Sequence, residues 1–193
     1  MDVNWKQVIA VTNRHLCEGD FLRQVERVAS LGVRAVILRE KDLSPAEYTV
    51  LAEQVMKICE TYGVSCILHK YVQAAQTLGC PNLHLPLADL LKLCHGEEKE
   101  LLYQFRQLGA SVHSAEDALL AEQAGCTYVT AGHVFQTDCK KDLPPRGIDF
   151  LRQICKTMAV PVFAIGGIHP DNIHMAMEAG ASGVCMMSEL MRV

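Results

Sequence analysis

The stretch Ala124-Gly-Cys-Thr-Tyr-Val-Thr-Ala-Gly-His133 contains one unit of the pattern from which this chain of 193 residues is built. Gly125 closes a helical pattern, and the apolar, β-favouring run Tyr128–Ala131 follows at once. The chain turns polar at His133, and Pro144–Pro145 excludes a helix from the loop that comes next. The stretch therefore predicts a buried strand that ends in a polar loop of roughly a dozen residues, a length that is often functional.

The same glycine-centred signal before an apolar run recurs along the chain. Alternation of fully apolar strands with helical patterns predicts a parallel sheet that is covered by helices. The signal stands at Leu31-Gly-Val33, Tyr62-Gly-Val64, Leu78-Gly-Cys80, Leu108-Gly-Ala110, Ala124-Gly-Cys126 and Ala179-Gly-Ala181.

Eight apolar runs qualify as strands, which predicts an α/β fold of the (β/α)8 TIM-barrel type as a single domain over residues 1–193. An open, doubly wound sheet of six strands is the alternative. Only six residues follow Met187, so the last helix is expected to be truncated. The expected strands are Val8–Thr12, Arg34–Leu38, Val64–Leu68, Asn82–Leu85, Arg106–Ala110, Tyr128–Ala131, Val160–Ile165 and Gly183–Met187.

Composition excludes several classes of protein. The net charge is -4 and no basic stretch offsets it, which argues against nucleic acid binding. No apolar run approaches the roughly 18 residues that a membrane span needs, and the first residues lack the features of a signal peptide. The nine cysteines are scattered and contain no Cys-x-x-Cys pair, which is typical of reduced thiols in a cytoplasmic protein.

Basic and titratable side chains gather where the predicted strands end. In (β/α)8 barrels the active site lies at these carboxyl ends, so the asymmetry predicts a site there. The alternative is that strand ends are more polar than strand middles in any sheet. The side chains concerned include Arg39, Lys41, His69, Lys70, His84, Ser111, His113 and His133.

The segment Ala164-Ile-Gly-Gly-Ile168 has the composition of a phosphate-binding loop. Its two glycines, Gly166 and Gly167, would let backbone N–H groups approach an anion, and the helix start that follows would add its dipole. Met187 and Ser188, at the end of the eighth strand, would supply further amides. Phosphate sites recur at this position in barrels, whereas an ordinary tight turn is the alternative.

Four motifs, in order along the chain, resemble the thiamine phosphate synthase superfamily. Within that superfamily the third motif resembles thiazole tautomerases more than synthases. The resemblance implies a (β/α)8 barrel, a phosphate held by Gly166, Gly167 and Ser188, and His133 as the catalytic residue. The motifs are Val36-Ile-Leu-Arg-Glu-Lys-Asp-Leu43, Ser111-Val-His-Ser114, Gly132-His-Val-Phe135 with its continuation to Lys140, and Ala164-Ile-Gly-Gly-Ile168.

Several positions depart from the synthase pattern. The synthase binds Mg²⁺ through an Asp after strand three, where this chain has Lys70, and an ammonium group would repel the cation. Asp89 matches a second magnesium ligand, but one carboxylate makes a poor site. Ile37 and His133 stand where the synthase has Gln and Pro. The sequence therefore predicts that synthase activity is lost and that no metal or other cofactor is needed.

The tautomerase resemblance implies isomerisation of a carboxythiazole phosphate to its aromatic form. One base that removes a proton and returns it to another carbon suffices, and a histidine, with an unperturbed pKa of about 6.5, suits that role. Asp138 or Thr137 would orient the His133 ring. Arg39 or Lys70 would neutralise the substrate carboxylate. The full set of expected substrate-binding residues is Arg39, Lys41, Lys70, Ser111, Thr137, Asp138 and Lys140.

Two other functions stay open at this point. One is magnesium-dependent synthesis of thiamine phosphate from a pyrimidine pyrophosphate and a thiazole phosphate. The other is a regulatory or ligand-binding homologue that keeps the phosphate loop without the chemistry. The expected partner in each case is a small phosphorylated molecule, not a nucleic acid or a membrane, and assembly into a homo-oligomer is left open.

Overall fold

Eight parallel strands form a closed barrel in the order β1 to β8, with helices alternating between them. The structure is a computed structural model and describes residues 3–97, 99–137 and 143–192. The closed sheet confirms the predicted (β/α)8 barrel over the open sheet. The strands are β1 (Val8–Val11), β2 (Ala35–Leu38), β3 (Ser65–His69), β4 (Asn82–Pro86), β5 (Gln107–Val112), β6 (Tyr128–Gly132), β7 (Val162–Ile165) and β8 (Gly183–Met186).

The chain divides into two compact units. One unit comprises residues 4–84 with 186–193, and the other comprises residues 1–3 with 85–185. A single domain over residues 1–193 stays a prediction.

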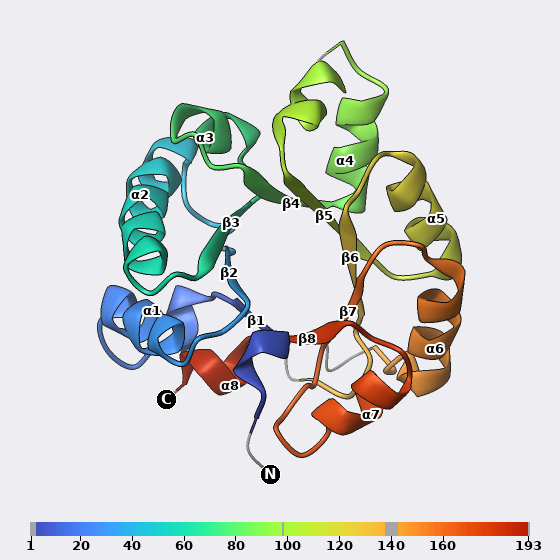
Figure 1. The fold of residues 1–193 in the computed structure, drawn as a ribbon. Coiled ribbons are helices and arrows are strands. Elements are labelled where there is room, and N and C mark those ends of the chain that lie inside the picture. Colours follow the sequence, from blue (N-terminus) through green and yellow to red (C-terminus); the bar gives the residue numbers. More distant parts are fainter. Residues whose placement is uncertain (1–2, 98, 138–142, 193) are drawn as a thin grey trace. The chain divides into compact units, whose positions relative to one another are not determined.

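The unit of residues 4–84 and 186–193 contains β1 to β3 and most of β4. Parallel pairing sets Ile37 of β2 beside Val11 of β1 and Ile67 of β3. In Figure 1, helices α1 and α2 lie side by side on the outer side of these strands. The helical segments are η1 (Trp5–Gln7), η2 (Arg14–Leu16), α1 (Phe21–Ser30), α2 (Pro45–Thr61), α3 (Val72–Thr77) and α8 (Ser188–Met191).

Helix α2 begins as its sequence predicts. Ser44 Oγ accepts a hydrogen bond from the N–H of Glu47, and the Glu47 carboxylate accepts one from the Ser44 N–H, which completes a capping box. Pro45 occupies the first helical position, where its missing N–H removes nothing. Tyr48, one turn into the helix, is fully buried and donates to the Leu38 carbonyl at 2.7 Å, so the helix is held against the end of β2.

The unit of residues 1–3 and 85–185 contains β5 to β7 and the paired part of β8. Register places Thr130 of β6 beside Ser111 of β5 and Phe163 of β7. Helices α5 and α6 pack together beside these strands (Figure 1). The helical segments are α4 (Leu87–Cys94), η3 (Lys99–Gln104), α5 (Ala115–Gln123), α6 (Gly147–Thr157) and α7 (Ile173–Glu178).

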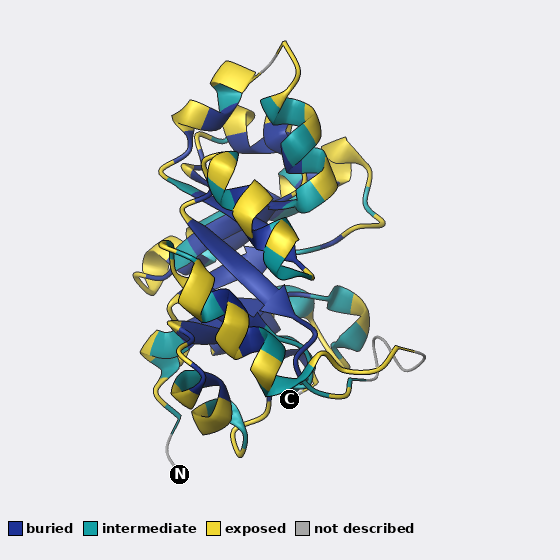
Figure 2. Ribbon diagram, turned by 90° about the vertical axis from the view of Figure 1, so that its right-hand side faces the viewer, coloured by how far each residue is buried: buried dark blue, intermediate teal, exposed yellow. Residues whose placement is uncertain are grey.

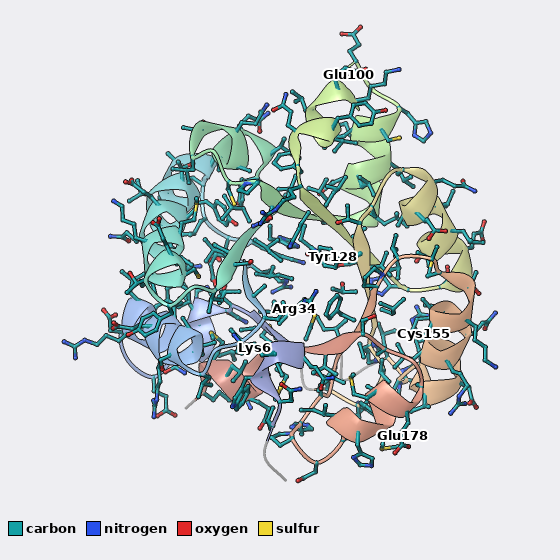
Figure 3. The ribbon with its side chains drawn as sticks, in the orientation of Figure 1. Lys6, Arg34, Glu100, Tyr128, Cys155 and Glu178 are labelled. Carbon is teal, nitrogen blue, oxygen red and sulfur yellow. The ribbon has the colours of Figure 1, made fainter. Side chains whose placement is uncertain are left out.

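The strands are the most deeply buried part of each unit. Figure 2 shows them as buried, while the helices alternate between buried and exposed faces. Tyr128 lies on the inner side of β6 with its ring edge-on to Phe163, whereas Glu100 points outward (Figure 3). The eight cysteines within the described residues are free, and five of them are buried, as expected for reduced core thiols. No helix within the described ranges is long and apolar enough to cross a bilayer.

Candidate functional site

His133 stands directly after β6 and is buried, with 6% of its surface exposed. Its Nε2 lies 3.3 Å from the carbonyl oxygen of Leu143. Its own carbonyl accepts a hydrogen bond from the Arg146 N–H at 3.0 Å. Residues near both ends of the loop that follows β6 therefore meet at this histidine, and the Leu143 carbonyl can orient its ring.

The end of β7 continues to pair with the residues after β6. The Val134 N–H donates to the Ile165 carbonyl at 2.9 Å, and the Phe135 N–H donates to the Gly166 carbonyl at 3.0 Å. A Cβ on Gly166 would lie 2.3 Å from the Cβ of His133, so a side chain there does not fit. Backbone pairing thus fixes His133 against the first glycine of the predicted phosphate loop.

Gly167 is equally constrained by its neighbours. A Cβ on it would lie 2.2 Å from the Gln136 carbonyl oxygen, and its φ of +66° favours glycine. The two glycines are therefore required by the close approach of the His133–Gln136 backbone. This packing role was not foreseen from the sequence, and the phosphate-binding role of Gly166 and Gly167 stays a prediction.

His113 supports the same segment from β5. Its Nδ1 lies 2.7 Å from the Gly132 carbonyl oxygen, and its N–H donates to Asp117 at 2.8 Å. Ser111, a predicted substrate residue, accepts from the Thr130 hydroxyl at 3.4 Å. The sequence placed His113 at a strand end, but its hydrogen bond to the residue before His133 depends on the β5–β6 register and could not be foreseen.

The remaining predicted residues of the loop are only partly covered. Asp138 and Lys140 lie outside the described residues. Thr137 is half-buried at the edge of the described part. The sequence named Thr137 or Asp138 as the group that orients the His133 ring, and this stays a prediction beside the contact of the ring with the Leu143 carbonyl.

In the unit of residues 4–84 and 186–193, the predicted residues Arg39, Lys41 and Lys70 lie near His69, one of a buried pair of histidines. His69 and His84 are paired in register, and their rings stack with centroids 5.9 Å apart. Burial, the adjacent His84 and the nearby cations including Arg39 and Lys41 lower the pKa of His69 to about 2. Burial lowers the pKa of His84 to about 3.

Both rings are therefore neutral at neutral pH, and the positive charge of the group is carried by Arg39, Lys41 and Lys70. Two uncharged imidazoles beside three cations suit an anionic group such as a carboxylate or a phosphate.

Met187 and Ser188, the other predicted phosphate residues, precede and open α8. The Met187 carbonyl accepts hydrogen bonds from Leu190 and Met191, and both Met187 and Ser188 are half-buried. They belong to the unit of residues 4–84 and 186–193, whereas Gly166 and Gly167 belong to the other unit. A phosphate site shared by these four residues stays a prediction.

The residues present do not fit the magnesium site of a synthase. Lys70, which by the resemblance stands where synthases have a ligand Asp, directly follows β3 and carries an ammonium group, whereas Mg²⁺ takes oxygen ligands. Asp89 lies in the first turn of α4. Within the described ranges no group of three or more His, Cys, Asp or Glu side chains could hold a metal ion.

Comparison with known proteins identifies the family of this chain. The sequence model of the family described as thiamine monophosphate synthase matches residues 8–190. The chain is 30% identical to a thiamine-phosphate synthase of Clostridium acetobutylicum over 190 aligned residues. The alignment covers 98% of this chain and 89% of the relative. It is 35% identical to "thiamine-phosphate synthase 2" of Streptococcus pneumoniae over 188 aligned residues. This alignment covers 94% of this chain and 86% of the relative.

A solved structure supports the same assignment. The thiamine phosphate pyrophosphorylase of Pyrococcus furiosus superposes with a TM-score of 0.82 at 26% identity, covering 98% of this chain and 89% of that chain. With a family match over nearly the whole chain, relatives at 30% and 35% identity and a matching barrel, the chain belongs to the thiamine monophosphate synthase family.

Proposed function

We propose that this chain is a thiazole tautomerase, which converts a carboxythiazole phosphate tautomer into its aromatic isomer with His133 as the base. One observation carries the proposal: His133 is buried and its Nε2 faces the Leu143 carbonyl oxygen. A carbonyl oxygen only accepts, so Nε2 carries the proton in the neutral ring. Nδ1 is then the nitrogen with a free lone pair, and it is the base.

The two proton transfers need one base, and the ring of His133 supplies it. Nδ1 takes the proton from the ring carbon that bears the carboxylate, and the electron pair of that C–H bond moves into the thiazole ring. The exocyclic alkene carbon then takes the proton back from Nδ1. Atoms and charge balance, the histidine ends as it began, and the aromatic product lies downhill. General base catalysis of this kind contributes roughly 10²- to 10⁴-fold.

The cationic group around His69 supplies the complementary role in the proposal. Arg39 or Lys70 neutralises the substrate carboxylate, which stabilises the carbanionic charge that develops beside it. Gly166, Gly167 and Ser188 hold the phosphate. Lys41, Ser111 and Thr137 line the substrate, as do Asp138 and Lys140.

Magnesium-dependent synthesis of thiamine phosphate is the second candidate, because the relatives at 30% and 35% identity are named thiamine-phosphate synthases. The ammonium of Lys70 at a magnesium-ligand position argues against it. The two reactions differ in their substrates and in their need for a divalent cation, so they can be separated by experiment.

The test is His133→Asn, assayed by the ultraviolet absorbance change of the thiazole tautomer. The amide keeps the size and one hydrogen bond but removes the basic nitrogen. We expect turnover to fall by about 10²-fold or more, with binding within a few-fold of the wild type. His174→Asn, which changes an exposed histidine of α7, is the matched control and should leave the rate unchanged. Full activity in His133→Asn would remove His133 as the base.

A further inference from the structure

Glu40 is a buried carboxylate between the ends of β1 and β2. Its side chain is 1% exposed. One oxygen accepts a hydrogen bond from the Thr12 hydroxyl at 2.6 Å, and both oxygens accept from the Arg14 N–H at 3.1 Å. The Arg14 guanidinium also donates to Glu40, at 3.2 Å. The buried charge is therefore paired and hydrogen-bonded, as a buried charge must be.

The far side of Arg14 is tied to Asp42. The guanidinium donates to both carboxylate oxygens of Asp42, one of them at 2.6 Å, and His15 Nε2 lies 2.9 Å from the same carboxylate. The hydrogen bond from Arg14 holds the pKa of the Asp42 carboxyl well below its usual range. Asp42 is about half exposed, so it forms the outer, solvent-facing end of this network, whereas Glu40 forms the buried end.

The network extends the pairing of two strands beyond their last backbone hydrogen bond. The Thr12 N–H donates to the Ile37 carbonyl at 3.0 Å, which is the last bond of the β1–β2 ladder in this direction. The Arg39 N–H donates to the Thr12 hydroxyl at 2.9 Å, and that hydroxyl donates to Glu40. The Thr12 hydroxyl thus donates its only proton to Glu40 and accepts a hydrogen bond from the backbone N–H of Arg39.

Glu40 stands between two cationic residues, Arg39 and Lys41. Glu40 turns to the Thr12 side, while Arg39 and Lys41 both lie close enough to His69 to lower its pKa. The Glu40 carboxylate therefore contacts the β1 side of this segment, whereas the neighbouring cations Arg39 and Lys41 lie on the side of His69.

We propose that Thr12 and Glu40 are positioning residues, which hold Arg39 in the orientation that binds an anionic group of the substrate. The inference rests on the role proposed above for Arg39. Thr12 and Glu40 do not contact the anion themselves; they fix the backbone from which Arg39 reaches it. Their removal lowers anion affinity through Arg39 alone.

The test is a double-mutant cycle with isothermal titration calorimetry as the readout. The probe is the aromatic carboxythiazole phosphate, whose carboxylate is the group that Arg39 is proposed to bind. Thr12→Val keeps the shape of the side chain and removes the hydroxyl, and Thr12→Ser restores the hydroxyl. We expect Thr12→Val, Glu40→Gln and Arg39→Ala each to weaken binding by about tenfold, which is the effect of one lost charge-assisted contact. Thr12→Ser and Asp42→Asn should stay within about twofold of the wild type.

The decisive measurement is Thr12→Val in the Arg39→Ala background. If Thr12 acts through Arg39, the second substitution adds no further loss, because its target is already gone. If Thr12→Val weakens binding equally in the wild type and in Arg39→Ala, the positioning role is overturned. It is also overturned if folded Thr12→Val and Glu40→Gln bind like the wild type while Arg39→Ala binds weakly. Unchanged binding in Arg39→Ala would instead remove Arg39 from anion binding and overturn both its proposed role and its positioning.

Discussion

At the scale of single residues, Lys70 has an unusual backbone conformation. Among the described residues it is the non-glycine residue with a positive φ, 73°. Its N–H donates to the carbonyl of His84 in the middle of β4 at 2.9 Å, and this hydrogen bond holds the conformation. A left-handed conformation costs an ordinary residue roughly 1–2 kcal/mol, and such strain concentrates at functional positions.

Lys70→Gly should therefore be more stable than Lys70→Ala by about 1 kcal/mol, because glycine adopts the same φ without the clash of a Cβ. Both variants remove the ammonium, so both should bind the substrate more weakly than the wild type. Urea denaturation of the two variants measures the difference. Equal stability would show that the conformation is not strained, and an unchanged KM would show that the ammonium does not meet the substrate.

The buried histidines predict a dependence of stability on pH. The pKa of His84 is lowered from 6.5 to about 3, so the folded state keeps the ring neutral while the unfolded chain protonates it below about pH 6.5. The unfolded state then binds more protons, and the free energy of unfolding falls as the pH falls from about 6.5 toward about 3. His69 acts in the same direction.

His84→Gln should lose less stability than the wild type between about pH 7 and about pH 5, by about 2 kcal/mol. Guanidinium denaturation at the two pH values gives the comparison. His174→Gln removes an exposed histidine and should follow the wild type. A wild-type loss that persists in full in His84→Gln would mean that this ring is not the one that titrates.

At the scale of elements, the junction of β6 and β7 determines where the candidate base lies. Backbone hydrogen bonds join Val134 to Ile165 and Phe135 to Gly166 beyond the ends of the two strands. The segment after β7 can approach this closely because its first two residues, Gly166 and Gly167, are glycines. We therefore expect a side chain at Gly167 to lower the stability of the fold, whether or not a ligand is bound.

Gly167→Ala and Gly79→Ala form a matched pair, because their φ values are +66° and +62°. A Cβ at Gly79 meets nothing within 4 Å, so that variant should cost only the roughly 1–2 kcal/mol of the backbone conformation. A Cβ at Gly167 would lie 2.2 Å from the Gln136 carbonyl, so a larger loss of several kcal/mol is expected. Thermal or urea denaturation checks the order, and similar losses would contradict the packing role.

The elements themselves were predictable because each carries its own signal. The eight strands were expected from apolar runs, and five of them (β2, β3, β4, β6 and β8) follow the glycine-centred signal. β5 spans Gln107–Val112 against the expected Arg106–Ala110, and its Gly109 lies inside the strand, not before it. Helix α2 was marked by Ser44, Pro45 and Glu47. What could not be predicted depends on register between strands: the contact of His113 with Gly132, and the stacking of His69 on His84.

At the scale of the whole molecule, the barrel and the family were predictable because the repeated pattern and the four motifs span most of the chain. The reaction is harder to predict from the sequence, because it depends on a few residues that differ between proteins of the same fold. Relatives named thiamine-phosphate synthases have the same fold and family as this chain. The difference expected here comes from positions such as Lys70 and His133, whose chemistry is not fixed by the fold.

The last prediction concerns which reaction the molecule performs. A synthase needs a divalent cation, and Lys70 places an ammonium where a ligand carboxylate is required. We therefore expect tautomerisation to proceed at the same rate with and without EDTA. We expect no thiamine phosphate from pyrimidine pyrophosphate and thiazole phosphate when Mg²⁺ is present, as followed by chromatography. Lys70→Asp alone should not create synthase activity, because Ile37 and His133 also differ from the synthase pattern. Synthesis at an ordinary enzymatic rate by the wild type would favour the second candidate, and loss of tautomerisation in EDTA would show that a metal takes part.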